Sequence, residues 1–415
     1  MTGALRKSFT LVIDQIRRGE TADWFVVAVA VSLPWSTSLT AILIVLWLIA
    51  VVPSLGFASV RREIQSPAGG LPLLLWALAV VGMFWADVDW SERLGGLRGY
   101  HKLLLIPLLL AQFRRSDRVR WVILGFFVSA LALLVLSWLT RYTGLFWERE
   151  QADPGVPVKD YILQSGIFAI CAFGLLEQAV AWRTTRPQLA LAAVAMAAFF
   201  VANTVYVATS LTTLVIIAVL LLVFGFRRFG WKGLLAVGIL GSVLAGLFWL
   251  SSPSLRDRVT HVAKEIKDYS ASTSETSAGL RLEFWKRSTE FVATAPVVGH
   301  GTGTIATLFR RSASGSTGMA AAVTGNPHNQ ILAVAIQLGF IGTFALISMW
   351  IVHLTLFREK TLVAWYGLTV VVSNVVGSLF NSHLFDFSQG WLYVFGVGIL
   401  GGTVLKRKQA ETKLA

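Results

Sequence analysis

Long apolar runs follow one another along almost the whole chain, and this feature constrains the fold more than any other. Most runs are about 15 to 25 residues long, which is enough for a helix to cross a hydrocarbon core of about 30 Å. The chain has 415 residues, of which 55% are hydrophobic and 14% are charged. Soluble domains carry about 25% charged residues. We therefore predict an all-α polytopic membrane protein rather than a soluble domain.

The apolar runs predict about twelve transmembrane helices. They do not show the alternating pattern, in segments of about ten residues, that is typical of outer-membrane barrels. The predicted spans are 22–37, 39–55, 71–87, 103–113, 121–140, 161–182, 188–206, 208–226, 233–251, 328–357, 361–382 and 389–405.

Lys and Arg residues gather in the short segments that lie on the same side as the N-terminus. This bias marks the cytoplasmic side of a membrane protein, so we expect both termini in the cytoplasm. The net charge of +14 then reflects orientation and does not indicate a nucleic-acid partner. One long extracytoplasmic loop divides the chain into residues 1–251 with spans one to nine, the loop 252–327, and residues 328–415 with three spans and a cytoplasmic tail.

The long loop is predicted to be partly helical. Leu255–Tyr269 and Ser277–Ala293 both have the periodicity of amphipathic helices. In the second, Arg281 and Trp285 are four residues apart and share a face. An arginine in such a position can bind a phosphate group with two parallel hydrogen bonds. The alternative is a solvated helix face, on which Arg287 would be exposed.

His328 follows the loop and is the first residue of the tenth predicted span. Pro327 suits the first turn of a helix, with Asn326 as its cap. A helix N-terminus disfavours a protonated imidazole, so His328 is expected to stay neutral and to accept a proton. The same helix end attracts phosphate. The alternative is an interfacial histidine bonded to the backbone.

Further charged residues are expected at the outer interface. Arg98 and Lys102 precede the fourth span and are either snorkelling anchors or phosphate ligands. Arg256 and Arg258 open the long loop and add positive charge. Asp386 is the single carboxylate of the turn between the last two spans. A cationic cluster of this kind suits a doubly anionic lipid headgroup.

The glycine-rich segment 296–303 is not preceded by a strand, which argues against a dinucleotide-binding turn. Its glycines indicate either a turn that approaches another backbone closely or an anion-binding nest. No sequence motif for a metal site is present, and Cys171 is the single cysteine. We therefore predict neither a metal nor a cofactor.

As a set, these features resemble the O-antigen ligase/polymerase superfamily of bacterial envelope proteins. The resemblance is specific over about residues 200–350 and otherwise rests on topology. It is carried by the long late loop, Arg281 and Trp285, the turn Pro296…Gly299-x-Gly301-x-Gly303, and His328-Asn329…Leu332 followed by Gly339…Gly342.

The resemblance implies a metal-independent, inverting transfer of a glycan from undecaprenyl pyrophosphate to lipid A–core (rough lipopolysaccharide), within membrane lipids at the periplasmic face of the bacterial inner membrane. It places the catalytic base on His328 and the essential loop arginine on Arg281, with Lys102 and Asp386 as supporting residues. Many relatives have Ser-Arg at the start of the eighth span, where this chain has Thr209-Ser210-Leu211. The full set of expected contacts to pyrophosphate and glycan is Lys102, Arg98, Arg258, Arg256, Trp285, Asn329 and Asp386.

Among members of this superfamily, the length and the short C-terminal tail favour a ligase that attaches O-antigen to lipid A–core. An O-antigen polymerase and a protein O-oligosaccharyltransferase remain alternatives. A secondary transporter is the alternative of a different class. Transporters place ionisable groups near the bilayer midplane, whereas here we expect only Glu177 to be buried within a span, and the candidate residues gather at one surface.

Overall fold

The computed structural model describes residues 19–143, 154–267, 269 and 276–414. Within these ranges the chain is helical and contains no strand, which confirms the predicted all-α polytopic fold. Residues 1–18, which hold the predicted cytoplasmic N-terminus, lie outside the described residues. In chain order the helices are α2 (Glu20–Ser32), α3 (Thr37–Val51), α4 (Phe57–Gln65), α5 (Pro67–Gly82), α6 (Trp90–Leu97), α7 (Leu105–Phe113), α8 (Val119–Thr143), α9 (Tyr161–Trp182), α10 (Pro187–Tyr206), α11 (Leu211–Ser251), α12 (Pro253–Lys267), α13 (Ser277–Thr294), α14 (Ile305–Ala313), α15 (Gln330–Leu356), α16 (Leu362–Gly377) and α17 (Phe387–Leu414), with short 3₁₀ helices at Val52–Ser54, His101–Leu104 and Gly318–Ala321.

Each of the twelve predicted spans falls on an apolar helix, but not every helix is long enough to cross a membrane by itself. Among the described residues, seven helices have the necessary length and composition, and an eighth crossing results if α4 and α5, bent by 81°, form one broken span. The segments His101–Phe113 and Leu362–Gly377 are apolar but shorter.

Two predicted spans, the eighth and the ninth, lie within α11, which reverses direction at Gly230. Gly230 has a φ of 61° and is not helical. A Cβ added to Gly225 would lie 2.7 Å from the carbonyl oxygen of Gly233, so the two arms meet beside this point. The C-terminal end of α11 lies beside the end of α10, close to where α11 begins, because the Ser252 hydroxyl donates a 3.1 Å hydrogen bond to the carbonyl of Val205. The helix is therefore a hairpin of two arms.

The tenth predicted span, α15, is broken at Gly339. This glycine has a φ of 59°, a left-handed conformation that glycine adopts without steric cost. A Cβ there would lie 2.3 Å from the carbonyl oxygen of Val297. The amide of Phe340 donates to the carbonyl of Pro296 at 2.8 Å. The glycine-rich turn thus fits into the break in the helix.

The backbone amides of the glycine-rich turn donate hydrogen bonds to α15 and to neighbouring elements. The amides of His300 and Gly301 donate to the carbonyls of Ile336 and Gln337 at 2.8 and 2.9 Å. The next two amides of the turn bond the end of α5 and a glutamine side chain of α15. Of the two structures that the sequence allowed, segment 296–303 is therefore a close-approach turn and not an anion-binding nest.

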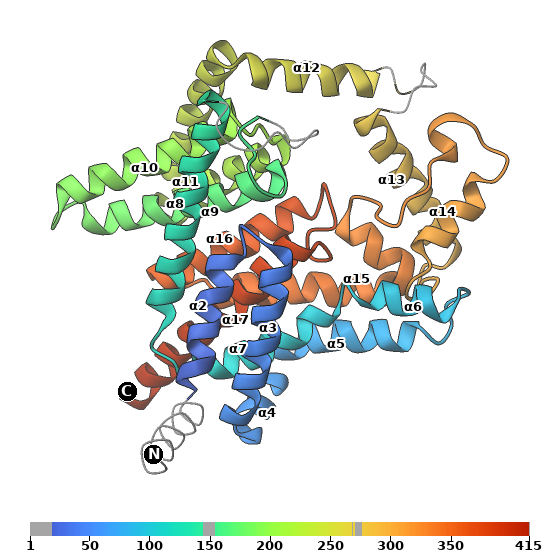
Figure 1. Ribbon diagram of the computed structural model, residues 1–415, viewed down its shortest axis with the longest axis horizontal. Helices are drawn as coiled ribbons and strands as arrows, with labels where there is room; N and C mark the ends of the chain where they lie inside the picture. Colours follow the sequence, from blue (N-terminus) through green and yellow to red (C-terminus); the bar gives the residue numbers. More distant parts are fainter. Residues whose placement is uncertain (1–18, 144–153, 268, 270–275, 415) are drawn as a thin grey trace, which may run out of the picture.

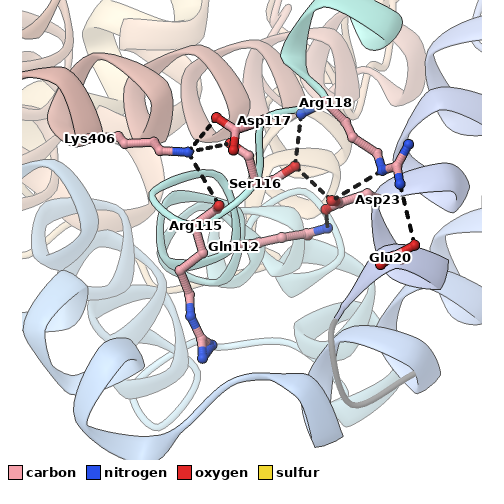
Figure 2. Close-up of polar contacts among 8 residues, drawn as sticks. All are labelled: Glu20, Asp23, Gln112, Arg115, Ser116, Asp117, Arg118 and Lys406. Carbon is pink, nitrogen blue, oxygen red and sulfur yellow. Dashed lines mark hydrogen bonds and ion pairs between the residues drawn. The ribbon is translucent and has the colours of Figure 1, made fainter. Parts of the chain in front are cut away.

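We call the end of the bundle that carries α12, α13 and α14 the loop side and the opposite end, with the start of α2 and the last turns of α17, the tail side (Figure 1). Polar side chains join the helices on the tail side, as Figure 2 shows. Asp23 accepts hydrogen bonds of 2.7 Å from both Gln112 and Ser116. Lys406 of α17 pairs with Asp117 at 2.6 Å. These contacts connect α2, the turn before α8, and α17.

Candidate active site on the loop side

His328 lies just before α15 and not inside it. The helix begins at Gln330, and the side chain of Asn329 caps it by accepting from two backbone amides at 2.9 and 3.1 Å. The expectation that Asn326 is the cap and Pro327 the first helical residue is therefore wrong. Asn326 instead accepts a 2.9 Å hydrogen bond from the His328 amide. His328 has a φ of 54°, in a region that histidine tolerates better than most residues.

The hydrogen bonds around the His328 ring determine which nitrogen carries the proton. Nδ1 lies 3.1 Å from Oδ1 of Asn381. The backbone amide of Ser382 also donates to this Oδ1, at 2.9 Å, so the atom is an acceptor. His328 must therefore donate from Nδ1, which leaves the lone pair on Nε2 in the neutral ring. No described residue bonds Nε2.

The surroundings of His328 favour its neutral form. Burial lowers the pKa of His328 below the ordinary value of 6.5, and the nearby positive charge of Arg281 lowers it further, while the hydrogen bond to Asn381 acts in the opposite direction. The ring stacks on Phe284 of α13, with a centroid distance of 6.2 Å and an interplanar angle of 17°. The site therefore holds a neutral imidazole with one free acceptor nitrogen.

Arg281 is a half-buried cation without a partner. Within the described part of the chain, its guanidinium makes no hydrogen bond or ion pair. Trp285, one turn further along α13, has a buried indole N–H that also lacks a hydrogen-bond partner. Since an unpaired charge and an unpaired donor are costly in partly buried positions, an anionic or polar ligand that reached them would supply the missing partners.

Arg287 has a structural role, so the expectation of an exposed residue on a solvated face is wrong. Its side chain is buried, with 4% of its surface exposed. The guanidinium donates to the carbonyls of Phe309, Ala320 and Ala322 at 2.6, 3.1 and 2.8 Å, and also to the hydroxyl of Ser312. These hydrogen bonds join α13 to α14 and to the 3₁₀ helix Gly318–Ala321 that follows.

An apolar cluster places α13 over the start of α15. Phe284 packs edge-to-face on Phe309 of α14, with ring centroids 5.4 Å apart. Ile305, Ala333 and Ile336 complete the buried set. Because Phe284 lies between Arg281 and Arg287 on the same helix, this packing brings Arg281 toward His328.

Lys102 and Asp386 lie behind the histidine, on the far side of Asn381. The Nδ2 of Asn381 donates to the Asp386 carboxylate at 3.0 Å. The Lys102 ammonium is buried and donates to the backbone carbonyls of Phe385 and Asp386 at 3.1 and 2.6 Å. Burial raises the pKa of Asp386 to about 6, although Lys102 acts to lower it. Lys102 thus holds the turn that carries Asn381.

The remaining expected residues are not brought into this cluster. Arg98 is exposed after α6. Arg256 donates to two carbonyls at the C-terminal end of α11, at 2.7 and 2.8 Å. Arg258 donates to the hydroxyl of Tyr161 at 2.7 Å and lies over its ring. None of the three forms a hydrogen bond or ion pair with a cluster residue in the described ranges.

Sequence reasoning missed Asn381 as a site residue, although it belongs to the polar turn that contains Asp386. A polar run between two apolar spans is a signal that such a turn is used, but only the structure identifies the residue that meets His328. The described residues contain no group of three or more His, Cys, Asp or Glu side chains arranged to hold a metal ion.

A comparison with protein families matches residues 191–347 to the family described as O-antigen ligase. The matched region runs from α10 through α15 and contains Arg281, Trp285, the glycine-rich turn and His328. A comparison with curated proteins finds no match. Residues 191–347, which include the loop helix and the histidine, are therefore similar to the O-antigen ligase family.

Proposed function

We propose that this protein is an O-antigen ligase that transfers a glycan from undecaprenyl pyrophosphate to lipid A–core. The family match supports ligase-type glycosyl transfer, and the apolar helices support a multi-pass membrane protein. The observation that carries the proposal is the unbonded Nε2 of His328, with the unpaired guanidinium of Arg281 close enough to lower the pKa of that ring. The proposed reaction requires two groups near each other, a base for the acceptor hydroxyl and a cation that binds the pyrophosphate.

The proposed reaction is a direct displacement at the anomeric carbon of the donor. The pyrophosphate binds Arg281, which neutralises the charge that develops on the leaving group. His328 takes the proton of the acceptor hydroxyl on Nε2 as that oxygen attacks the anomeric carbon. The bond from this carbon to the pyrophosphate oxygen breaks, undecaprenyl pyrophosphate leaves, and His328 later releases its proton to water. A single displacement inverts the anomeric centre and requires no metal.

Lys102, Asp386 and the arginines of α12 have supporting roles in this proposal. The ammonium of Lys102 already bonds two backbone carbonyls, so it orients the turn and adds long-range positive charge. Arg256 and Arg258 bind helix α11 and Tyr161, and they are positioned to attract an anionic donor before it reaches Arg281.

We further propose that the loop side faces the periplasm and that the protein resides in the inner membrane. The short segments of the tail side hold most of the Lys and Arg residues, as expected for the cytoplasmic side. Glu177, the ionisable residue that a transporter mechanism would have used, is paired with Arg228 on the tail side. This pairing favours an enzyme over a transporter.

The proposal is tested by reconstitution of the purified protein with an undecaprenyl-linked glycan and rough lipopolysaccharide. We expect lipid A–core that carries the glycan, together with released undecaprenyl pyrophosphate. A longer glycan that stays on undecaprenyl would instead identify a polymerase, and glycan on an added protein would identify a protein glycosyltransferase. Movement of the substrate across the membrane without a covalent product would contradict enzymatic transfer.

A further inference from the structure

We propose that Asn381 is a positioning residue that selects the tautomer of His328, so that Nε2 and not Nδ1 receives the proton of the acceptor hydroxyl. The catalytic part of this inference rests on the proposed function, whereas the tautomer itself is a property of the folded protein.

Every hydrogen-bonding atom of the Asn381 side chain is used, and each bond agrees with one orientation. Its Oδ1 accepts from the Ser382 amide at 2.9 Å, from Asn326 Nδ2 at 2.9 Å and from His328 Nδ1 at 3.1 Å. Its Nδ2 donates to the Asp386 carboxylate at 3.0 Å. A reversed amide would direct an N–H at the Ser382 N–H and an oxygen at the carboxylate. Hydrogen bonds to both the oxygen and the nitrogen of the amide therefore fix its orientation.

The fixed oxygen permits only one neutral tautomer of His328. A neutral imidazole has one N–H and one acceptor nitrogen, and the partner of one nitrogen decides the state of the other. Because Asn381 Oδ1 can only accept, Nδ1 keeps its hydrogen and Nε2 keeps its lone pair. Without this oxygen the hydrogen can move to Nε2, and a ring in that form cannot accept a proton there.

Other contacts hold the position of His328, so the contribution of Asn381 is distinct from simple support. Asn326 accepts from the backbone amide of His328, and Phe284 stacks on the ring. What Asn381 adds is an acceptor without charge. A carboxylate in direct contact with the ring would favour the imidazolium and raise the pKa of His328. The neutral amide of Asn381 instead separates the Asp386 carboxylate from the ring.

Four charged groups face this arrangement and enter any pH-dependent measurement. Arg281 approaches from α13 and lowers the pKa of His328. Asp386 lies behind Asn381, and both Lys102 and Asp160 act on Asp386. A test based on pH must therefore keep the total charge constant while it changes the group that contacts the ring.

The first experiment compares Asn381→Ala with the double variant Asn381→Asp/Asp386→Asn, which exchanges the amide and the carboxylate and keeps the net charge. We expect Asn381→Ala to lower kcat at least tenfold and at most by the factor of about 10²–10⁴ that loss of a general base causes, and to leave the donor KM within about twofold. The exchange should restore most of the kcat at alkaline pH, because an acceptor again faces Nδ1. The acidic limb of the pH–rate profile of this double variant should move to higher pH, because a carboxylate now contacts the imidazole and raises its pKa.

Gln389→Ala is the matched control. This amide is half-buried near the start of α17 and makes no hydrogen bond with His328 or Asn381, so its kcat and pH profile should equal those of the wild type. If Asn381→Ala keeps its kcat, or if the exchanged variant has an unshifted acidic limb, the inference is overturned. Thermal unfolding of each variant identifies one that has simply lost its fold.

The second experiment measures the tautomer without any substrate. ¹⁵N-histidine NMR at neutral pH should show a ring signal, absent from His328→Gln, with Nδ1 protonated and Nε2 unprotonated. In Asn381→Ala this signal should shift toward the tautomer with hydrogen on Nε2. A proton on Nε2 in the wild type would refute the assignment. If the NMR result holds but the reconstituted wild type transfers no glycan, the proposed function fails and the tautomer assignment stands.

Discussion

Arg287 donates a 2.6 Å hydrogen bond to the carbonyl of Phe309 while its guanidinium lies 4.7 Å from the centroid of that residue's ring. One buried side chain thus joins α13 to α14 through both a charged hydrogen bond and a cation–π contact. Residues 277–322 are therefore a packed unit in which the helix α13 carries Arg281 near His328. This arrangement separates two arginines on one helix into a structural residue and a candidate ligand.

Replacement of Arg287 is expected to destabilise the loop. In Arg287→Ala the carbonyls of Phe309, Ala320 and Ala322 lose their donor, and hydrogen bonds to a charged group contribute about 1.5–3 kcal/mol. We expect faster amide hydrogen exchange and faster proteolysis in residues 277–322, with transfer lost as a consequence. Lys286→Ala, at an exposed neighbouring position, should behave like the wild type. Equal protection in Arg287→Ala and Lys286→Ala would contradict the structural role.

Replacement of Arg281 is expected to affect donor use while the fold is kept. Lysine lacks the planar fork that binds phosphate with two parallel bonds, so Arg281→Lys should lose most of the transfer, as should Arg281→Ala. Binding of the undecaprenyl-linked donor should weaken in both variants, whereas binding of rough lipopolysaccharide should not. Since Arg281 has no partner in the described residues, thermal stability should stay near that of the wild type. Full activity in Arg281→Lys would show that only a surface charge is needed.

The pH dependence of transfer should report the environment of His328. The base is active when unprotonated, and burial together with Arg281 lowers its pKa below 6.5. The rate should therefore be constant near neutral pH and fall only as the pH drops below 6.5. Removal of the charge in Arg281→Gln should move this acidic limb to higher pH, because one cause of the lowered pKa is gone. Lys286→Gln should leave the limb in place. An acidic limb that shifts downward in Arg281→Gln would contradict the proximity of the two groups.

Much of the fold was predictable, because hydrophobic run length and loop charge are local properties of the sequence. The helices at Pro253–Lys267 and Ser277–Thr294 lie within a few residues of the predicted amphipathic segments. The hairpin at Gly230 was also anticipated, as two separate spans. How the chain turns at the ends of the short apolar helices His101–Phe113 and Leu362–Gly377 was not predictable, since a run of apolar residues does not show where the backbone bends within it.

The geometry of the site was less predictable, because it depends on contacts between residues far apart in the chain. His328 and Arg281 could be selected as candidates from local patterns. The meeting of Asn381 with His328, 53 residues apart, could not. The burial of Arg287 depends on carbonyls 22 to 35 residues away, which no local helical pattern reveals. Asn329 became the helix cap because the chain turns at His328 and not before Pro327.

Transfer is expected to survive removal of divalent cations. The proposed mechanism neutralises the leaving group with the fixed charge of Arg281, so an added metal ion has no required role. Activity in saturating EDTA should equal that in Mg²⁺ within experimental error. Loss of transfer in EDTA, with recovery on addition of Mg²⁺ or Mn²⁺, would contradict the mechanism.

The most direct test of the account is the rate of glycan transfer by His328→Ala in proteoliposomes that contain both lipid substrates. Loss of a general base typically lowers a rate by about 10²–10⁴-fold. We expect a loss of this size, with wild-type thermal stability and unchanged donor binding through Arg281. Transfer at the wild-type rate by a folded His328→Ala protein would contradict the assignment of His328 as the base.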